Sequence, residues 1–366
     1  MTLDEVWLCD PSSTCITYGL LSVFKLSLSL FLYHTILAIL TVGATDSRHP
    51  RGGLHVSKWP IKMLLVIALF FACWFIPNTF FGAFSTISLS GAAAFSLAQV
   101  ALLFEFADLF VAPYQQRISD DGDRAAFALL LLASFLFFSL CAAMISLIFV
   151  MYGGCARNLA FAGVTVGLVV MLIVISLSPR VQQGRPQLGL FHAALIGAFV
   201  SFLMWSAIIA APQDDGSEIA CDFPIWETQN AMEIAVRVVS GGFLLIALWN
   251  IAFSQGDSSE EATPLVMSAS DIDTTGSSRS ASSPSQGEEP YSFTKFHQLM
   301  ASGALYLGMI SSDWNLLTVW WEGEDGRELI APDQGEATMW VKMALSWVGF
   351  LIFIAVAIAP LVRNRD

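Results

Sequence analysis

The chain contains 366 residues, of which 55% are apolar and only 13% are charged, and its mean hydropathy is +0.66. This composition excludes an ordinary soluble domain and predicts an all-α, polytopic membrane protein. The net charge is −13 and no basic patch is present, so nucleic-acid binding is also excluded.

Nine apolar segments are long enough to be interpreted as membrane-spanning helices. The first is too long, and the flank before it too acidic, for a cleaved signal peptide, so we expect it to remain in the mature protein. The segment 60–76 lies at the lower limit of length for a span. The predicted spans are 16–43, 60–76, 82–112, 125–152, 158–178, 188–210, 232–253, 292–312 and 338–361.

These spans predict three parts. Residues 1–253 hold seven helices, residues 254–290 form a loop, and residues 291–366 hold two helices joined by an acidic outer loop at 313–337. The loop at 254–290 is rich in serine and acidic residues and poor in large apolar ones, which predicts a disordered segment without catalytic function.

Lysine and arginine in the connections predict the orientation in the membrane. Ten fall on one side and two on the other, so the carboxyl terminus is predicted to be cytosolic and the amino terminus extracytosolic. The first set is Arg48, Arg51, Lys58, Arg117, Arg124, Arg180, Arg185, Arg279, Arg363 and Arg365, and the second is Arg157 and Arg327. Cys155 and Cys221 then share the outer side, which makes them a candidate disulfide.

In the first span, Lys25 has a stem long enough for its amine to snorkel to the outer interface, although it is also a candidate polar group for a lipid path. The histidines His34 and His192 are interpreted as buried structural residues. Their positions inside apolar segments carry no pattern of metal ligands or of a nucleophile with its base.

Residues 80–113 predict a long, tilted helix, because the segment is nearly free of charge and exceeds the thickness of the hydrocarbon core. Small residues at Ser88, Ala92 and Ser96 recur every four positions and predict close helix packing. Glu105 and Asp108 share one face inside the predicted span. Either they are satisfied by other helices or a hydrated vestibule, or they help to move a polar group.

Three further patterns occur along the chain. Asp121-Gly122-Asp123-Arg124 resembles the start of the metal-binding motif of CDP-alcohol phosphatidyltransferases, but the downstream aspartates are missing, so we interpret it as a solvated turn. Gly163 and Gly167 form a GxxxG pair that predicts helix packing. Glu233 and Arg237 are four residues apart, so an ion pair on one helical face is expected, which is either structural or part of a polar track.

The carboxyl-terminal third has the most distinctive sequence, namely Tyr291, Ser292, Phe296, His297, Tyr306, Trp314, Trp340, Val341, Lys342, Ser346, Trp347, Ala359, Pro360, Asn364, Arg365 and Asp366. In these residues the chain resembles the serine incorporator (SERINC) family of multipass membrane proteins. Earlier matches are Pro50, Arg51, His55, Trp59 and Lys62, the run Phe104-Glu105-Phe106-Ala107, in which the family usually has Asp in place of Glu, and Trp205-Ser206-Ala207.

The resemblance implies ten helices in two subdomains divided by a long diagonal helix, which residues 80–113 would supply. This chain would lack the first helix, either because the sequence is truncated at its start or because the lineage lost it. The family is named for a proposed role in placing serine into phosphatidylserine and sphingolipids. It is also associated with non-selective phospholipid scrambling and, in some animal members, with antiviral restriction.

Several functions are compatible with the sequence. No catalytic triad spacing, zinc-ligand cluster, phosphate loop or intact carboxylate motif is present, so we predict neither an enzyme nor a cofactor. A scramblase needs only polar groups along a membrane path, for which the candidates are Lys25, Glu105, Asp108, Glu233, Arg237 and Lys342. A serine carrier should show repeats, which we do not find. A scaffold for lipid-synthesis enzymes stays open.

The expected partners are membrane phospholipids. Sphingolipids, serine and a second copy of the chain stay open as further partners, and the plasma membrane and the endomembranes stay open as locations.

Overall fold

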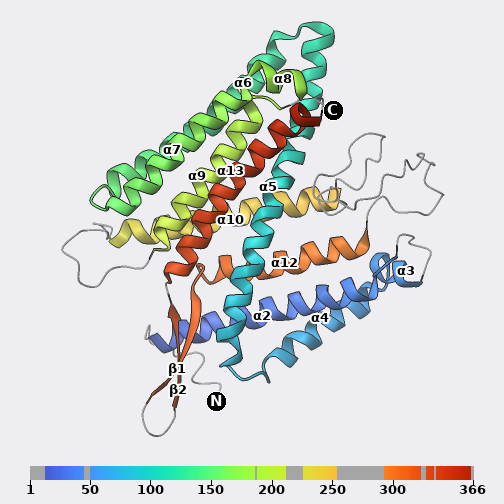
Figure 1. Cartoon of the computed structure of the whole chain (residues 1–366). Coiled ribbons are helices and arrows are strands. Elements are labelled where there is room, and N and C mark those ends of the chain that lie inside the picture. The colour runs from blue at the N-terminus through green and yellow to red at the C-terminus, as the bar shows by residue number, and fades with distance from the viewer. Residues whose placement is uncertain are drawn as a thin grey trace. The chain divides into compact units, whose positions relative to one another are not determined.

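Figure 1 shows the computed structural model of the chain, which describes residues 13–44, 50–185, 188–211, 226–253, 292–322, 327–333 and 335–363. The loop predicted at 254–290 and Cys221 lie outside these residues. The chain forms two compact units, with boundaries after Phe95, after Val239 and before Gly335. Unit 1 holds the amino-terminal helices, and unit 2 holds most of the central helices and the last one.

Each of the nine predicted spans is a helix in the structure. Their bounds are α2 Ser13–Leu40, α4 Trp59–Cys73, α5 Phe80–Asp121, α6 Arg124–Met151, α7 Ala156–Ser176, α9 Leu190–Ile209, α10 Trp226–Phe253, α12 Phe293–Ser311 and α13 Glu336–Arg363. Two short helices, α3 (Pro50–Val56) and α8 (Pro179–Gly184), lie in connections that the sequence predicted as turns. Both begin with proline, whose fixed φ suits the first turn of a helix.

Six helices among the described residues are long and apolar enough to cross a membrane: α2, α5, α6, α7, α9 and α13. Two shorter apolar helices accompany them, namely α4 and the segment Ile234–Leu248 of α10. On α6 and α7, large apolar side chains such as Phe127, Phe135 and Val174 are exposed, which a multipass protein tolerates because lipid covers them. The prediction of an all-α, polytopic membrane protein is confirmed.

In unit 1, α2 packs between α12 and α4 (Figure 1). Gly308 of α12 allows a close approach to α2, because a Cβ added there would lie 2.6 Å from Ser27 Oγ. The Ser27 hydroxyl donates a hydrogen bond of 2.9 Å to the carbonyl oxygen of Ala304. A glycine on one helix and a serine on the other thus allow α2 and α12 to come into direct contact.

In unit 2, α9 is the central helix and contacts α6, α7 and α13. Every side chain from Phe191 to Ile208 is buried. The Ser346 hydroxyl of α13 donates to the Val200 carbonyl of α9 at 3.1 Å. A helix that is apolar all round is expected at such a buried position, since no face has to meet solvent.

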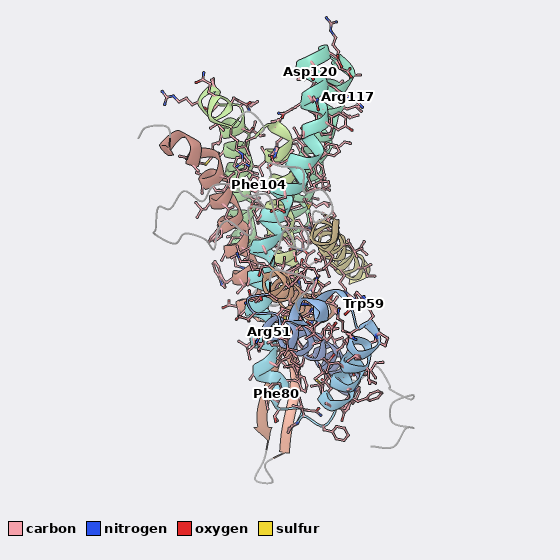
Figure 2. The ribbon with its side chains drawn as sticks, turned by 90° about the vertical axis from the view of Figure 1, so that its right-hand side faces the viewer. Arg51, Trp59, Phe80, Phe104, Arg117 and Asp120 are labelled. Carbon is pink, nitrogen blue, oxygen red and sulfur yellow. The ribbon has the colours of Figure 1, made fainter. Side chains whose placement is uncertain are left out.

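Helix α5 is longer than predicted, with 42 residues that correspond to roughly 60 Å. Figure 2 shows it running from Phe80 past Phe104 to Arg117 and Asp120. The sequence predicted this helix over residues 80–113. The helix instead includes Pro113 and continues through residues that favour helix.

The interpretation of residues 121–124 as a plain solvated turn needs refinement. Gly122 adopts a φ of 64°, the left-handed conformation that ends many helices. Asp123 then caps α6, since its carboxylate accepts hydrogen bonds from the backbone N–H of Ala125 at 2.8 Å and of Ala126 at 3.3 Å. The Asp-Gly-Asp sequence therefore joins two helices.

The predicted outer loop at 313–337 contains a β-hairpin. Strands β1 (Leu316–Glu322) and β2 (Arg327–Asp333) pair antiparallel, with Leu316 opposite Asp333. The sequence LLTVWWE of β1 is rich in residues that favour strands, a signal that the acidic composition of the loop obscured. The hairpin is held in unit 1 by a hydrogen bond of 3.1 Å from the Leu317 N–H to the Ser85 hydroxyl.

The packing role predicted for the GxxxG pair is not found among the described residues. A Cβ added at Gly163 or Gly167 would meet none of their atoms within 4 Å, apart from neighbouring groups of α7 itself. The buried face of α7 instead contains Phe161, Thr165 and Val169. In contrast, Ser88, Ala92 and Ser96 of α5 are buried, as their spacing predicted. A GxxxG spacing indicates close packing only where another helix faces it.

The orientation in the membrane stays a prediction, which tagging tests. In intact cells that carry the protein at their surface, an epitope inserted after Gln213 should bind antibody. An epitope after Ser270 should bind only after permeabilisation, because the lysine and arginine bias places that loop in the cytosol. The reverse pattern of accessibility would overturn the predicted orientation.

Candidate functional site

Asp108 of α5 is the centre of a polar cluster in unit 2. Its Oδ1 lies 2.9 Å from Nε2 of His192, and its Oδ2 accepts a hydrogen bond of 3.3 Å from the Arg185 guanidinium. The side chains of Asp108 and Arg185 are 26% and 25% exposed, whereas that of His192 is fully buried. The cluster thus combines a buried imidazole with an ion pair that the surroundings can reach.

The turn between α7 and α9 positions both partners of Asp108. Arg185 follows α8 directly, and its N–H donates to the Val181 carbonyl at 2.8 Å. The Gln182 side chain donates to the carbonyl oxygens of Ser176 at 2.6 Å and Leu188 at 3.2 Å, so it links the two ends of the turn. His192 then falls in the first turn of α9.

Aromatic rings enclose the buried side of the cluster. The Phe104 ring, one helical turn before Asp108, lies 6.3 Å from the His192 ring, and Phe110 stacks on Phe191 at 4.7 Å. Nδ1 of His192 is buried and has no hydrogen-bond partner among the described residues. His192 therefore uses Nε2 to orient the carboxylate, while the outer edge of Asp108 stays accessible.

The sequence predicted Asp108 as a polar candidate, but it did not predict Arg185 or His192 as its partners. Arg185 was considered only for orientation, and His192 as a structural histidine. A usable signal was present, because the predicted topology places residues 108, 185 and 192 at the same side of the membrane. Glu105, the second acidic candidate, is half-buried one turn earlier on α5.

Lys342 of α13 is a further candidate in unit 2, and it is 1% exposed. Its Nζ donates to the Ser206 hydroxyl at 2.8 Å and to the Ser206 carbonyl at 3.2 Å. Hydrogen bonds of this kind offset part of the cost of burying a charge. This contact joins two of the motifs that carry the family resemblance, and it connects α13 to α9.

Lys25 lies on α2 in unit 1, where its side chain is buried. The residue is 5% exposed, and its Nζ lies 4.5 Å from the centre of the Trp74 ring and 5.6 Å from that of Phe81. The aromatic rings at the end of α4 and the start of α5 hold the ammonium by cation–π attraction. Trp74 and Phe81 lie at the predicted outer ends of their helices, so snorkelling of Lys25 towards the outer interface stays a prediction.

The remaining candidates are described only in part. Arg237 is exposed on α10, and the side chain of Glu233 lies outside the described residues, so their ion pair stays a prediction. Cys155 is disulfide-bonded, and pairing with Cys221 stays a prediction because Cys221 lies outside the described part of the chain. Within that part, no group of three or more His, Cys, Asp or Glu side chains is arranged to hold a metal ion.

Comparison with known proteins assigns the chain to a family. The profile of the serine incorporator family (Serinc) matches residues 1–365. A probable serine incorporator of Nematostella vectensis is 28% identical over 98% of this chain and 84% of its own length. A probable serine incorporator of Dictyostelium discoideum is 28% identical over 82% and 71%. Serine incorporator 3 of Bos taurus is 26% identical over 94% and 79%. The chain therefore belongs to the serine incorporator family of multipass membrane proteins.

Proposed function

We propose that the protein moves phospholipids between the two leaflets, and that the ion pair of Asp108 and Arg185 contacts their headgroups. The partial exposure of this pair carries the proposal. Within an apolar helical unit, an accessible carboxylate and guanidinium form a surface complementary to a zwitterion. The carboxylate suits the ammonium of a phosphatidylcholine or phosphatidylethanolamine headgroup, and the guanidinium suits its phosphate.

The same geometry supports a second candidate function, a carrier that supports serine incorporation into lipids. Free serine is also a zwitterion, so its ammonium and carboxylate would fit the same pair. The relatives carry the name serine incorporator. Neither function needs a catalytic centre, since both consist of movement along a polar path. The proposal includes an integral location in the plasma membrane or an endomembrane, with a cytosolic carboxyl terminus.

Reconstitution distinguishes the two functions. Purified protein is placed in liposomes of phosphatidylcholine with a fluorescent, headgroup-labelled lipid, and bleaching by a membrane-impermeant reductant reports exchange between leaflets. Uptake of radiolabelled serine is measured on the same vesicles. We expect lipid exchange without ATP, and no serine uptake above that of protein-free liposomes. Serine uptake without lipid exchange would favour the carrier, and the absence of both activities would overturn both proposals.

A further inference from the structure

Three histidines from three helices of unit 1 form a chain of paired ring nitrogens. Nδ1 of His34 on α2 lies 3.2 Å from Nδ1 of His297 on α12. Nε2 of His297 lies 3.1 Å from Nδ1 of His55 on α3. His297 is thus the central member and uses both of its nitrogens. The nitrogens face one another in series instead of converging on one point, so the arrangement differs from a set of metal ligands.

Counting hydrogens shows how many protons the three histidines accept together. A neutral imidazole has one N–H donor and one acceptor nitrogen, so neutral His297 donates to one neighbour and accepts from the other. Adding one proton makes His297 a donor at both nitrogens, and both contacts are retained if each neighbour presents its lone pair. A second proton would place two N–H groups against each other and break a contact. The three histidines can therefore bind one additional proton without losing a contact.

The surroundings determine the cost of that proton. Aromatic rings surround the three histidines. Phe293 stacks on His55 with ring centres 4.5 Å apart, and Phe296 lies edge-on to His55 at 5.1 Å. The Tyr33 ring lies 4.8 Å from that of His34. These rings displace part of the surrounding water, which penalises a cation.

Charged groups on the neighbouring elements add to this cost. From α4, the Lys62 ammonium donates a hydrogen bond to the His55 carbonyl. Its positive charge therefore lies close to the three histidines and repels a proton bound to them. The other cations on these elements are Arg51, which is exposed on α3, Lys58, which is exposed at the start of α4, and Lys295, which is half-buried on α12. Lys25 of α2 is buried against the Trp74 ring. In Figure 2, the labels Arg51 and Trp59 mark α3 and the start of α4.

We propose that His34, His55 and His297 form one proton-binding site, and that proton binding releases α3 from α12. In the neutral state, the pairing of His55 with His297 and the stacking of His55 on Phe293 fasten α3 to α12. With a proton bound, the shared cation lies close to Lys62 in an aromatic surrounding. Movement of the seven-residue α3 away from α12 removes this unfavourable arrangement, because His55 then regains contact with water.

The sign of the effect follows from His55, which lies outside the membrane-spanning segments. Burial, with repulsion from Lys62 as the smaller cause, lowers the pKa of His55 from 6.5 to about 4. We call the state with α3 on α12 closed and the state with α3 released open. The open state therefore binds a proton at a higher pH than the closed state does. The closed state is favoured fully above pH 6.5, and it loses stability as the pH falls from 6.5 towards 4.

Hydrogen exchange followed by mass spectrometry tests the proposal on the full chain in lipid nanodiscs. Exchange of the amides of residues 54–57 is compared at pH 7.0 and 4.5 after correction for the intrinsic pH dependence of exchange. We expect their protection to fall by at least tenfold, because a pKa lowered from 6.5 to about 4 gives more than one pKa unit of linkage between these two pH values. The amides of α9 serve as an internal reference that should keep its protection. Equal loss in α9 would indicate global acid unfolding and would overturn the proposal, as would unchanged protection in residues 54–57.

Two variants assign the effect to the histidines. His55→Gln and His297→Gln keep a hydrogen-bonding side chain at each position but do not titrate. In each variant, the protection of residues 54–57 should lose most of its dependence on pH between 7.0 and 4.5. If either folded variant retained the tenfold fall, the proton would bind elsewhere. His55 is half-buried on a short helix, so His55→Gln provides the test if His297→Gln fails to fold.

Discussion

Replacing Asp108 with asparagine is expected to slow phospholipid exchange in liposomes by about tenfold, which corresponds to about 1.4 kcal/mol in activation free energy. The amide keeps the shape of the carboxylate and can still accept one of its two hydrogen bonds, but it no longer offers a negative charge to a headgroup ammonium. Because Asp108 and Arg185 are each about a quarter exposed, water screens the loss of their attraction, and the melting temperature in detergent should stay near that of the wild type.

Measuring exchange and stability on the same protein separates a lipid path from a structural role. If Asp108 serves only to neutralise Arg185 and orient His192, its replacement should lower the melting temperature before it affects exchange. Asp120→Asn is a matched control, because Asp120 is an exposed acid near the end of the same helix. Glu105→Gln, alone and together with Asp108→Asn, shows whether the second acid contributes. If the double variant changed neither quantity, Lys25 and Lys342 would become the next candidates.

The helices could be predicted from the sequence because membranes impose a simple rule on it. Backbone groups in hydrocarbon must pair within their own segment, so long apolar runs become helices. The ends of α5 and the hairpin at 316–333 could not be predicted in the same way. Residues beyond Pro113 and the strand residues of the outer loop lie outside the apolar runs, where helix, strand and turn compete on small differences in propensity.

The candidate residues could be predicted as single groups, but their partners could not. Intramembrane charges such as Asp108 and Lys342 stand out in an apolar sequence. Their partners, among them His192 and Ser206, are ordinary residues whose role depends on which helices pack together. The alternation of predicted spans nevertheless limits the choice. Each of these pairs, like the chain of histidines, joins residues that the predicted topology places at one and the same side of the membrane.

Replacing Gly308 with alanine is expected to cost about 2 kcal/mol of stability and to lower the melting temperature clearly. The new Cβ would lie 2.6 Å from Ser27 Oγ and 2.8 Å from Ser27 Cβ. The hydroxyl can rotate, although its bond to the Ala304 carbonyl would be lost, but the Cβ moves only with the backbone of α2. Helices α2 and α12 must therefore separate, and overpacking of this kind costs about 1–3 kcal/mol.

Two further variants show whether the loss comes from that contact. Gly163→Ala makes the same chemical change on α7, where the new Cβ would have no described atom outside the helix within 4 Å, so its melting temperature should match or slightly exceed that of the wild type. In the background of Gly308→Ala, Ser27→Gly removes both clashing atoms and should restore part of the stability. The recovery should be incomplete, because the hydrogen bond to Ala304 is lost, and such a bond contributes about 1 kcal/mol. If Gly308→Ala were as stable as Gly163→Ala, the close approach of α2 and α12 would not support the fold of unit 1.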